Sequence, residues 1–126
     1  QMEWRPNASD RLIIGGALLH AKSDDIAEDY SRTVPDSIFN LLWIHREPGG
    51  LSTGLAYYYT DECLYLGGDQ IDAVRRLDFK VAQKIGRKNN PGELALVLQN
   101  MLRSYSDFSE NNVFDSRAYV SLSMQF

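Results

Sequence analysis

The predicted fold depends on residues 69–105, which read DQIDAVRRLDFKVAQKIGRKNNPGELALVLQNMLRSY. In the first half of this stretch, Asp69 suits a helix N-cap and Gly86 suits a C-terminal stop. The apolar residues between them recur at spacings of three and four: Ile71, Val74, Leu77, Val81 and Ile85. Such spacing is typical of the buried stripe of an amphipathic helix, so we predict a helix over residues 70–86.

The second half of the stretch predicts another helix, over residues 91–105. Asn90, Pro91 and Glu93 supply an N-cap, a first-turn proline and a capping-box glutamate. The expected buried stripe is Leu94, Val97, Leu98, Met101, Leu102 and Tyr105. We expect the two helices to pack on one face of a sheet and to bury Leu77, Val81, Leu98 and Met101.

Three strands are predicted before these helices. Residues 38–46 are rich in Ile, Phe, Leu and Trp and end at the turn sequence EPGG. Residues 55–60 include three consecutive tyrosines, which favour a half-buried strand. A tight connection through Asp61 and Glu62 then leads into a third strand over residues 63–66. This order predicts an antiparallel meander.

The two ends of the chain supply the remaining elements. Residues 11–21 are ambiguous, because the apolar run LII before two glycines suits either a buried strand or a buried helix. Ser23, followed by two acids, predicts a short helix that ends near Arg32. Residues 118–126 alternate strictly between apolar and polar side chains, which is the pattern of a strand with one buried face.

Together these elements predict a single α+β domain over residues 2–126. Its antiparallel meander of three to five strands is covered on one face by two helices, and the C-terminal strand joins the sheet. The length of 126 residues, with 44% apolar and 24% charged residues, suits one compact domain. Gln1 ahead of Met2 is interpreted as a tag remnant.

The expected compartment is the cytoplasm. The lone Cys63 has no partner for an intramolecular disulfide, which favours a reducing environment. The sequence has no signal-peptide pattern, and its longest apolar run, residues 12–19, is far shorter than the roughly 20 residues of a membrane span. We therefore expect no association with a membrane.

Charge is divided between two blocks of the sequence. Residues 24–72 hold ten acids against two bases, and residues 75–88 hold six bases against one acid. On the predicted helix, Arg76, Lys80, Lys84 and Arg87 form a basic ridge opposite the apolar stripe. The ridge could meet a protein partner or form an ordinary solvated face. Nucleic acid is disfavoured as a partner, because the whole chain has a net charge of −4 and no interleaved exposed aromatics.

The acidic block and one tyrosine complete the candidate partner-binding set. Asp61 and Glu62 could face a basic partner such as a toxin or an enzyme, where paired charges give fast and salt-sensitive association. Alternation along the strand sends Tyr57 and Tyr59 to one face of the sheet and Tyr58 to the other. Tyr58 could therefore belong to an exposed aromatic patch. Ordinary surface polarity and packing within the monomer are the alternative readings of both features.

We find no catalytic or cofactor signature. His20, His45 and Cys63 are the conventional imidazole and thiol candidates, and nothing in the sequence places them together. Gly67-Gly68 lacks the pattern of a phosphate-binding loop, and Asp69 would repel an anion there. No metal-ligand spacing is present. We therefore predict no catalytic residues, no metal site and no cofactor.

These observations lead to three hypotheses about function. The first is a small protein-interaction domain without catalysis, of the inhibitor, immunity-protein or adaptor type, which binds through its separated acidic and basic surfaces. The second is a structural subunit of a homo-oligomer, in which the basic ridge of one copy meets the acidic block of the next. The third is a small enzyme or ligand-binding domain that uses the strand meander.

Overall fold

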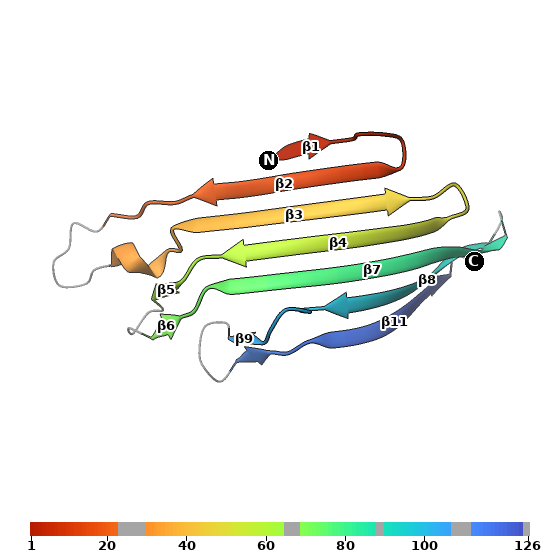
Figure 1. The fold of residues 1–126 in the computed structure, drawn as a ribbon. Coiled ribbons are helices and arrows are strands. Elements are labelled where there is room, and N and C mark those ends of the chain that lie inside the picture. Colours follow the sequence, from red (N-terminus) through yellow and green to blue (C-terminus); the bar gives the residue numbers. More distant parts are fainter. Residues whose placement is uncertain (23–29, 65–68, 88–89, 107–111, 125–126) are drawn as a thin grey trace.

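The chain forms one long antiparallel sheet (Figure 1). The structure is a computed structural model, and it describes residues 1–22, 30–64, 69–87, 90–106 and 112–124. Seven strands lie in the order β1-β2-β3-β4-β7-β8-β11, and each pair of neighbours is antiparallel. Their bounds are Met2–Trp4 (β1), Asp10–Leu18 (β2), Ser37–Arg46 (β3), Leu51–Thr60 (β4), Val74–Arg87 (β7), Asn90–Gln99 (β8) and Arg117–Met124 (β11).

Short elements gather at one end of this sheet (Figure 1). One 3₁₀ turn, η1, spans Tyr30–Thr33. Two small hairpins pair β5 with β6 and β9 with β10. Their bounds are Cys63–Leu64 (β5), Gln70–Ile71 (β6), Tyr105–Ser106 (β9) and Val113–Phe114 (β10).

The helix predicted over residues 70–86 is wrong, because most of this segment is strand β7. Leu77 and Val81 are four residues apart, a spacing that fits both the helical period of 3.6 and the strand period of 2. Phe79, which lies between them, favours the strand, because Leu77, Phe79 and Val81 share one face of a strand. Alternation thus describes the segment better than the helical spacing does.

The helix predicted over residues 91–105 is wrong for the same reason. Leu94, Leu96 and Leu98 alternate with smaller or polar residues along β8, and β8 pairs with β7 in a hairpin. The proline and glutamate that we read as helix-capping residues lie in this strand instead. The α+β class is therefore wrong as well: in the described residues the structure is nearly all β, and its one helical segment is η1.

The other segments form the following elements. Strands β3 and β4 contain the segments predicted as strands, and Gly50, whose φ is +85°, donates its N–H to the Glu47 carbonyl at 3.0 Å in the turn between them. Of the third predicted strand, Cys63–Leu64 form β5, which pairs with β6, and residues 65–66 lie outside the described residues. The ambiguous residues 11–21 are mostly in β2. The helix predicted from Ser23 falls largely outside the described residues.

No second layer covers the sheet within the described residues. The contacts between elements run between neighbouring strands and among the small elements at one end. Ala82 and Ala95 are the only fully buried apolar residues there, and no large side chain is fully buried. The predicted burial is therefore wrong: Leu77, Val81 and Leu98 are half-buried, and Met101 is 47% exposed.

The surface area reflects this single layer. The chain exposes 9331 Å², whereas a globular protein of 14.3 kDa exposes about 6,800 Å². The excess of about 2,500 Å² is surface that a two-layered domain of this size would bury. In the described part of the chain, no helical segment has the length and apolar character of a membrane span.

Candidate functional site

One face of the main sheet is apolar across its whole width. Directly opposite residues in an antiparallel pair share a face, so the register gives rows of side chains that cross the sheet. One row is Trp4, Leu12, Trp43, Leu55, Phe79, Leu98 and Ala118. The next row towards the turn between β7 and β8 includes Val81, Leu96 and Val120. The row on the other side of the first one, towards the start of β7, includes Met2, Ile14, Leu41, Tyr57 and Leu77. We call this surface the apolar face.

The apolar face is least covered at its two edges. Val120 and Leu122 on β11 are 67% and 64% exposed, and Met2 and Trp4 on β1 are also more than half exposed. Towards the centre, Trp43 and Phe79 are half-buried, and among the described residues the neighbours of their strands are strands of the same sheet. Contiguous apolar patches of this extent are rare on soluble monomers and mark interaction surfaces.

Hydrogen-bonded polar groups border the apolar face at the end of β3. The Asp10 carboxylate accepts hydrogen bonds from Trp43 Nε1 at 3.0 Å and from Asn7 Nδ2 at 2.8 Å, and it lies 2.8 Å from Nδ1 of His45. The hydrogen bonds from Asn7, His45 and Trp43 lower the pKa of Asp10. The polar atom of Trp43 is thus satisfied within the sheet, while its ring stays on the apolar face.

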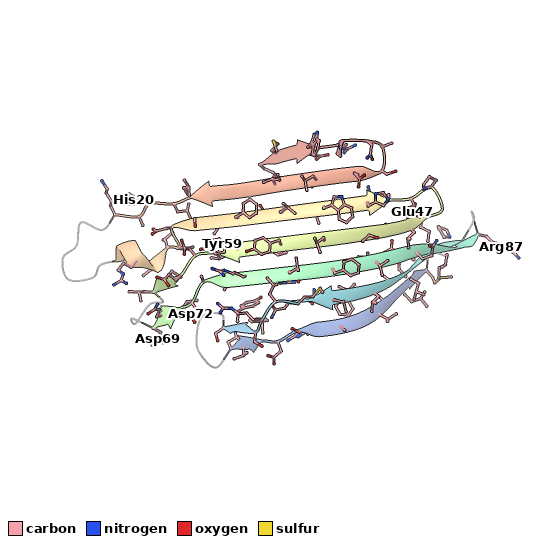
Figure 2. The ribbon with its side chains drawn as sticks, viewed as in Figure 1. His20, Glu47, Tyr59, Asp69, Asp72 and Arg87 are labelled. Carbon is pink, nitrogen blue, oxygen red and sulfur yellow. The ribbon has the colours of Figure 1, made fainter. Side chains whose placement is uncertain are left out.

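A second polar cluster closes the opposite end of the face (Figure 2). The Tyr59 hydroxyl and the Ser37 hydroxyl each donate to Asp61 at 3.1 Å, and the Glu62 N–H donates to Asp61 at 3.0 Å. These donors, Tyr59 first, lower the pKa of the Asp61 carboxyl, and the carboxylate raises the pKa of Tyr59. An apolar centre with hydrogen-bonded polar groups at its ends is the usual anatomy of a protein–protein interface.

The other face of the sheet, which we call the polar face, carries three of the four bases of the predicted ridge. Arg76, Lys80 and Lys84 are even-numbered residues of β7 and lie on the polar face, while Arg87 falls on the opposite side by alternation. Tyr58 also lies there, with the Arg76 guanidinium 5.6 Å from its ring centre. The ridge predicted from helical geometry is therefore replaced by a row along one strand.

Two of these bases already have acidic partners. Arg76 pairs with Asp78, which raises the pKa of Arg76, and Lys80 Nζ lies 2.7 Å from the Glu93 carboxylate. Lys84 makes no ion pair with a described residue. It lines a groove of about 670 Å³ on the polar face, beside apolar residues such as Leu42, Ile44 and Val97. The role of these bases in partner binding stays a prediction.

The acidic candidates differ in their surroundings. Asp61 is engaged by three hydrogen bonds at the end of β4, whereas Glu62 is exposed beside it. Asp69 and Asp72 lie at the same end of the sheet, and Arg87 lies at the opposite end (Figure 2). The ends are not uniform in charge, because Glu47 lies at the end with Arg87 (Figure 2), while Arg75 and Arg76 lie beside Tyr59 and Tyr58 towards the other end. Partner binding by Asp61 and Glu62 stays a prediction.

The thiol and imidazole candidates are divided between the two ends of the sheet. His45 and Cys63 lie at opposite ends of the sheet, separated by about 20 Å or more along β3. His20 and Cys63 line the same depression of about 350 Å³, together with Asp36 and Glu62. Burial raises the pKa of the Cys63 thiol, which disfavours the nucleophilic thiolate. No described cluster of histidine, cysteine or acidic residues could hold a metal ion.

Our sequence reasoning missed the apolar face, although a signal for it was present. The run Leu77, Phe79 and Val81 and the run Leu94, Leu96 and Leu98 both alternate with polar or smaller residues. Together with the alternation of residues 118–126, these runs describe three strands with one apolar face each.

Comparisons of the chain with protein-family models, with curated proteins and with solved structures give no match.

Proposed function

We propose that this chain is a structural subunit of a homo-oligomer, in which the apolar face of one copy packs against the apolar face of a second copy. The observation that carries the proposal is the apolar face, which no other described element covers. This face includes two tryptophans and crosses all seven strands. A sheet with one apolar face must bury that face against another layer to be stable in water. A second sheet about 10 Å away would complete a β-sandwich.

The size of the exposed surface supports a second copy as this layer. The excess of about 2,500 Å² per chain corresponds to about 5,000 Å² for a pair, which is within the range of obligate homodimers. Obligate interfaces also resemble a domain core that has been divided between two chains. The apolar face has this character, because its centre is free of charged side chains and its hydrogen-bonded carboxylates stand at its ends.

An adaptor or inhibitor that binds a protein partner through the polar face is the second candidate. The groove beside Lys84 supports it, since Lys84 and Arg46 both line the groove and both are exposed. Association through these charges would weaken as salt rises, because exposed charges are screened beyond about 8 Å at physiological ionic strength. Association through the apolar face would persist or strengthen in high salt.

The test is the mass of the protein in solution at 50 mM and 500 mM salt. We expect a species of at least twice 14.3 kDa at both salt concentrations. Leu96→Glu places a carboxylate on the apolar face and should raise the dissociation constant at least about tenfold. Val97→Glu is the matched control, because Val97 is the next residue of β8 and lies on the polar face. A wild-type monomer at all concentrations, or equal effects of the two variants with both still folded by circular dichroism, would contradict the proposal.

A further inference from the structure

The outer edge of β11 is an open edge of the sheet (Figure 1). All eight residues of β11 are exposed, and among the described residues β8 is the only strand that pairs with it. In an antiparallel sheet, the N–H and C=O groups of alternate residues of an edge strand point away from the sheet. The outer edge of β11 therefore presents a row of backbone donors and acceptors without strand partners.

This edge lacks the devices by which sheet proteins block unwanted pairing. Natural edge strands are often very short, interrupted by proline or a bulge, or protected by charged side chains. Strand β11 is eight residues long, contains no proline or lysine, and pairs with β8 residue by residue without interruption. Its single charge is Arg117, at its first position. Such a strand is well suited to accept another strand.

The opposite edge of the sheet differs in this respect. There β1 is three residues long and covers only part of β2, from Leu12 to Ile14, and Pro6 follows β1 closely. A strand that approached β2 of a neighbouring copy would find only Gly15–Leu18 uncovered beyond β1. The two edges are therefore poorly matched to each other, and a head-to-tail filament would use only half of β11.

We propose that β11 pairs antiparallel with β11 of a second copy, about a two-fold axis, so that two seven-stranded sheets become one sheet of fourteen strands. Such a contact is closed and uses the same strand in both copies. A register centred on Ser121 sets Val120 of one copy opposite Leu122 of the other. The apolar face then continues across the junction without a break.

The charges are compatible with this pairing. In the register centred on Ser121, no two charged residues of β11 lie opposite each other, because Arg117 stands at the far end of each strand. The antiparallel arrangement also brings the end with Asp69 and Asp72 of one copy to the same end of the combined sheet as Arg87 of the second copy (Figure 2). Parallel pairing would instead place like ends together.

The test uses opposite charges at the centre of the proposed contact. Ser121 lies on the polar face, and the residue directly opposite it on β8 is the uncharged Ala95, with Glu93 as its diagonal neighbour. Ser121→Asp and Ser121→Lys should each weaken edge pairing at least about tenfold, because like charges lie opposite each other. An equimolar mixture of the two variants should restore it. Asn40→Asp and Asn40→Lys, at an exposed position on the polar face of β3, are the control pair and should leave the mass unchanged.

The outcome is independent of the proposed packing of the apolar faces. If both contacts exist, the wild type is a tetramer, Leu96→Glu and Ser121→Asp each leave a dimer, and the double variant is a monomer. If Ser121→Asp, Ser121→Lys and their mixture all keep the wild-type mass, the edge contact is refuted while the face contact stands. If only the position-121 variants lower the mass, the face contact is refuted while the edge contact stands.

Amide hydrogen exchange gives a second measurement that needs no variant. Edge pairing buries the outward N–H groups of β11, so exchange over residues 117–124 should slow at least about tenfold as the protein concentration rises through the dissociation constant. Exchange in these residues that is fast and independent of concentration, in a protein that is oligomeric by mass, would overturn the proposal.

Discussion

Leu96 on β8 lies directly opposite Val120 on β11, and both side chains are exposed on the apolar face, at 40% and 67%. An apolar pair across two strands normally stabilises a sheet by removing both side chains from water. Here the two side chains lie opposite each other, but they remain in contact with solvent, because no described element packs over them. On the apolar face, β8 and β11 therefore add surface that the described part of the chain does not bury, which explains why a second layer from another chain is expected.

We predict that stability depends on protein concentration. If the apolar face is buried only in the oligomer, dissociation is coupled to unfolding and the thermal midpoint rises with concentration by mass action. The measurement is a series of thermal melts over a hundredfold range of concentration. Leu96→Glu should flatten this dependence, whereas Val97→Glu should preserve it. A midpoint that is constant over the whole range for the wild type would contradict burial between copies.

We predict that Gly92→Ala loosens β11. A Cβ atom at Gly92 would stand 2.8 Å from the Ser123 carbonyl oxygen and 2.5 Å from the sulfur of Met124, both on β11. The backbone oxygen has little freedom to move, so the substitution should cost about 1–3 kcal/mol, as overpacking usually does. The measurement is the unfolding free energy in urea.

Gly54→Ala is the matched control for this substitution. Gly54 lies in the middle of β4, and its added Cβ would meet nothing closer than the Trp43 carbonyl oxygen at 3.9 Å. Replacing a strand glycine by alanine there should be neutral or stabilise by up to about 1 kcal/mol. Equal effects of the two substitutions would show that β11 does not lie against Gly92 as described.

Parts of the fold could be predicted from local composition, and other parts could not. Strands β3 and β4 contain β-branched and aromatic residues around a glycine turn, so propensity and turn chemistry agree. At β7 and β8 two periods compete, because leucines four residues apart satisfy both a helix and a strand. The apparent helix caps at Asp69 and Asn90 then favoured the wrong alternative. Phe79 and Leu96 lie outside the two predicted helical stripes and fit the strand period.

The candidate site shows a different limit of sequence reasoning. Alternation could have predicted an apolar face on each of β7, β8 and β11, and it did so for the C-terminal segment. Whether such a face is covered by the same chain depends on the number of layers that the chain can supply. Helices over residues 70–86 and 91–105 would supply a second layer, whereas as β7 and β8 these residues add to the first. The partner-binding residues on β7 were placed by helical geometry, so Arg87 was grouped with Lys84 although strand geometry separates them.

We predict that Asn100 is required for the junction between the main sheet and the β9–β10 hairpin. Its backbone has a φ of +54°, its N–H donates to Asp78 at 2.9 Å, and its side-chain Nδ2 donates to the Phe114 carbonyl at 2.7 Å. Asn100→Gly keeps the left-handed backbone and loses only the side-chain hydrogen bond, at a cost of about 1 kcal/mol. Asn100→Ala loses the side-chain hydrogen bond and also strains the left-handed backbone. It should therefore lower the unfolding free energy in urea by about 1 kcal/mol more than Asn100→Gly does. An alanine variant as stable as the glycine variant would contradict the backbone assignment.

We predict that Asp61 makes the protein less stable in acid. The hydrogen bonds from Tyr59, Glu62 and Ser37 lower the pKa of Asp61 in the folded state. Their contribution is therefore fully present above the unfolded pKa of about 4 and is lost as the pH falls through the lower folded pKa. The measurement is the thermal midpoint from pH 7 to pH 2 at a fixed protein concentration.

Asp61→Asn should lower the midpoint at pH 7 and reduce the decline below pH 4. Tyr59→Phe should act in the same direction, because it removes the first of the three donors. Asp72→Asn, which changes an exposed carboxylate at the same end of the sheet, is the control and should follow the wild-type curve. If Asp61→Asn also follows the wild-type curve, these three hydrogen bonds do not stabilise the folded state.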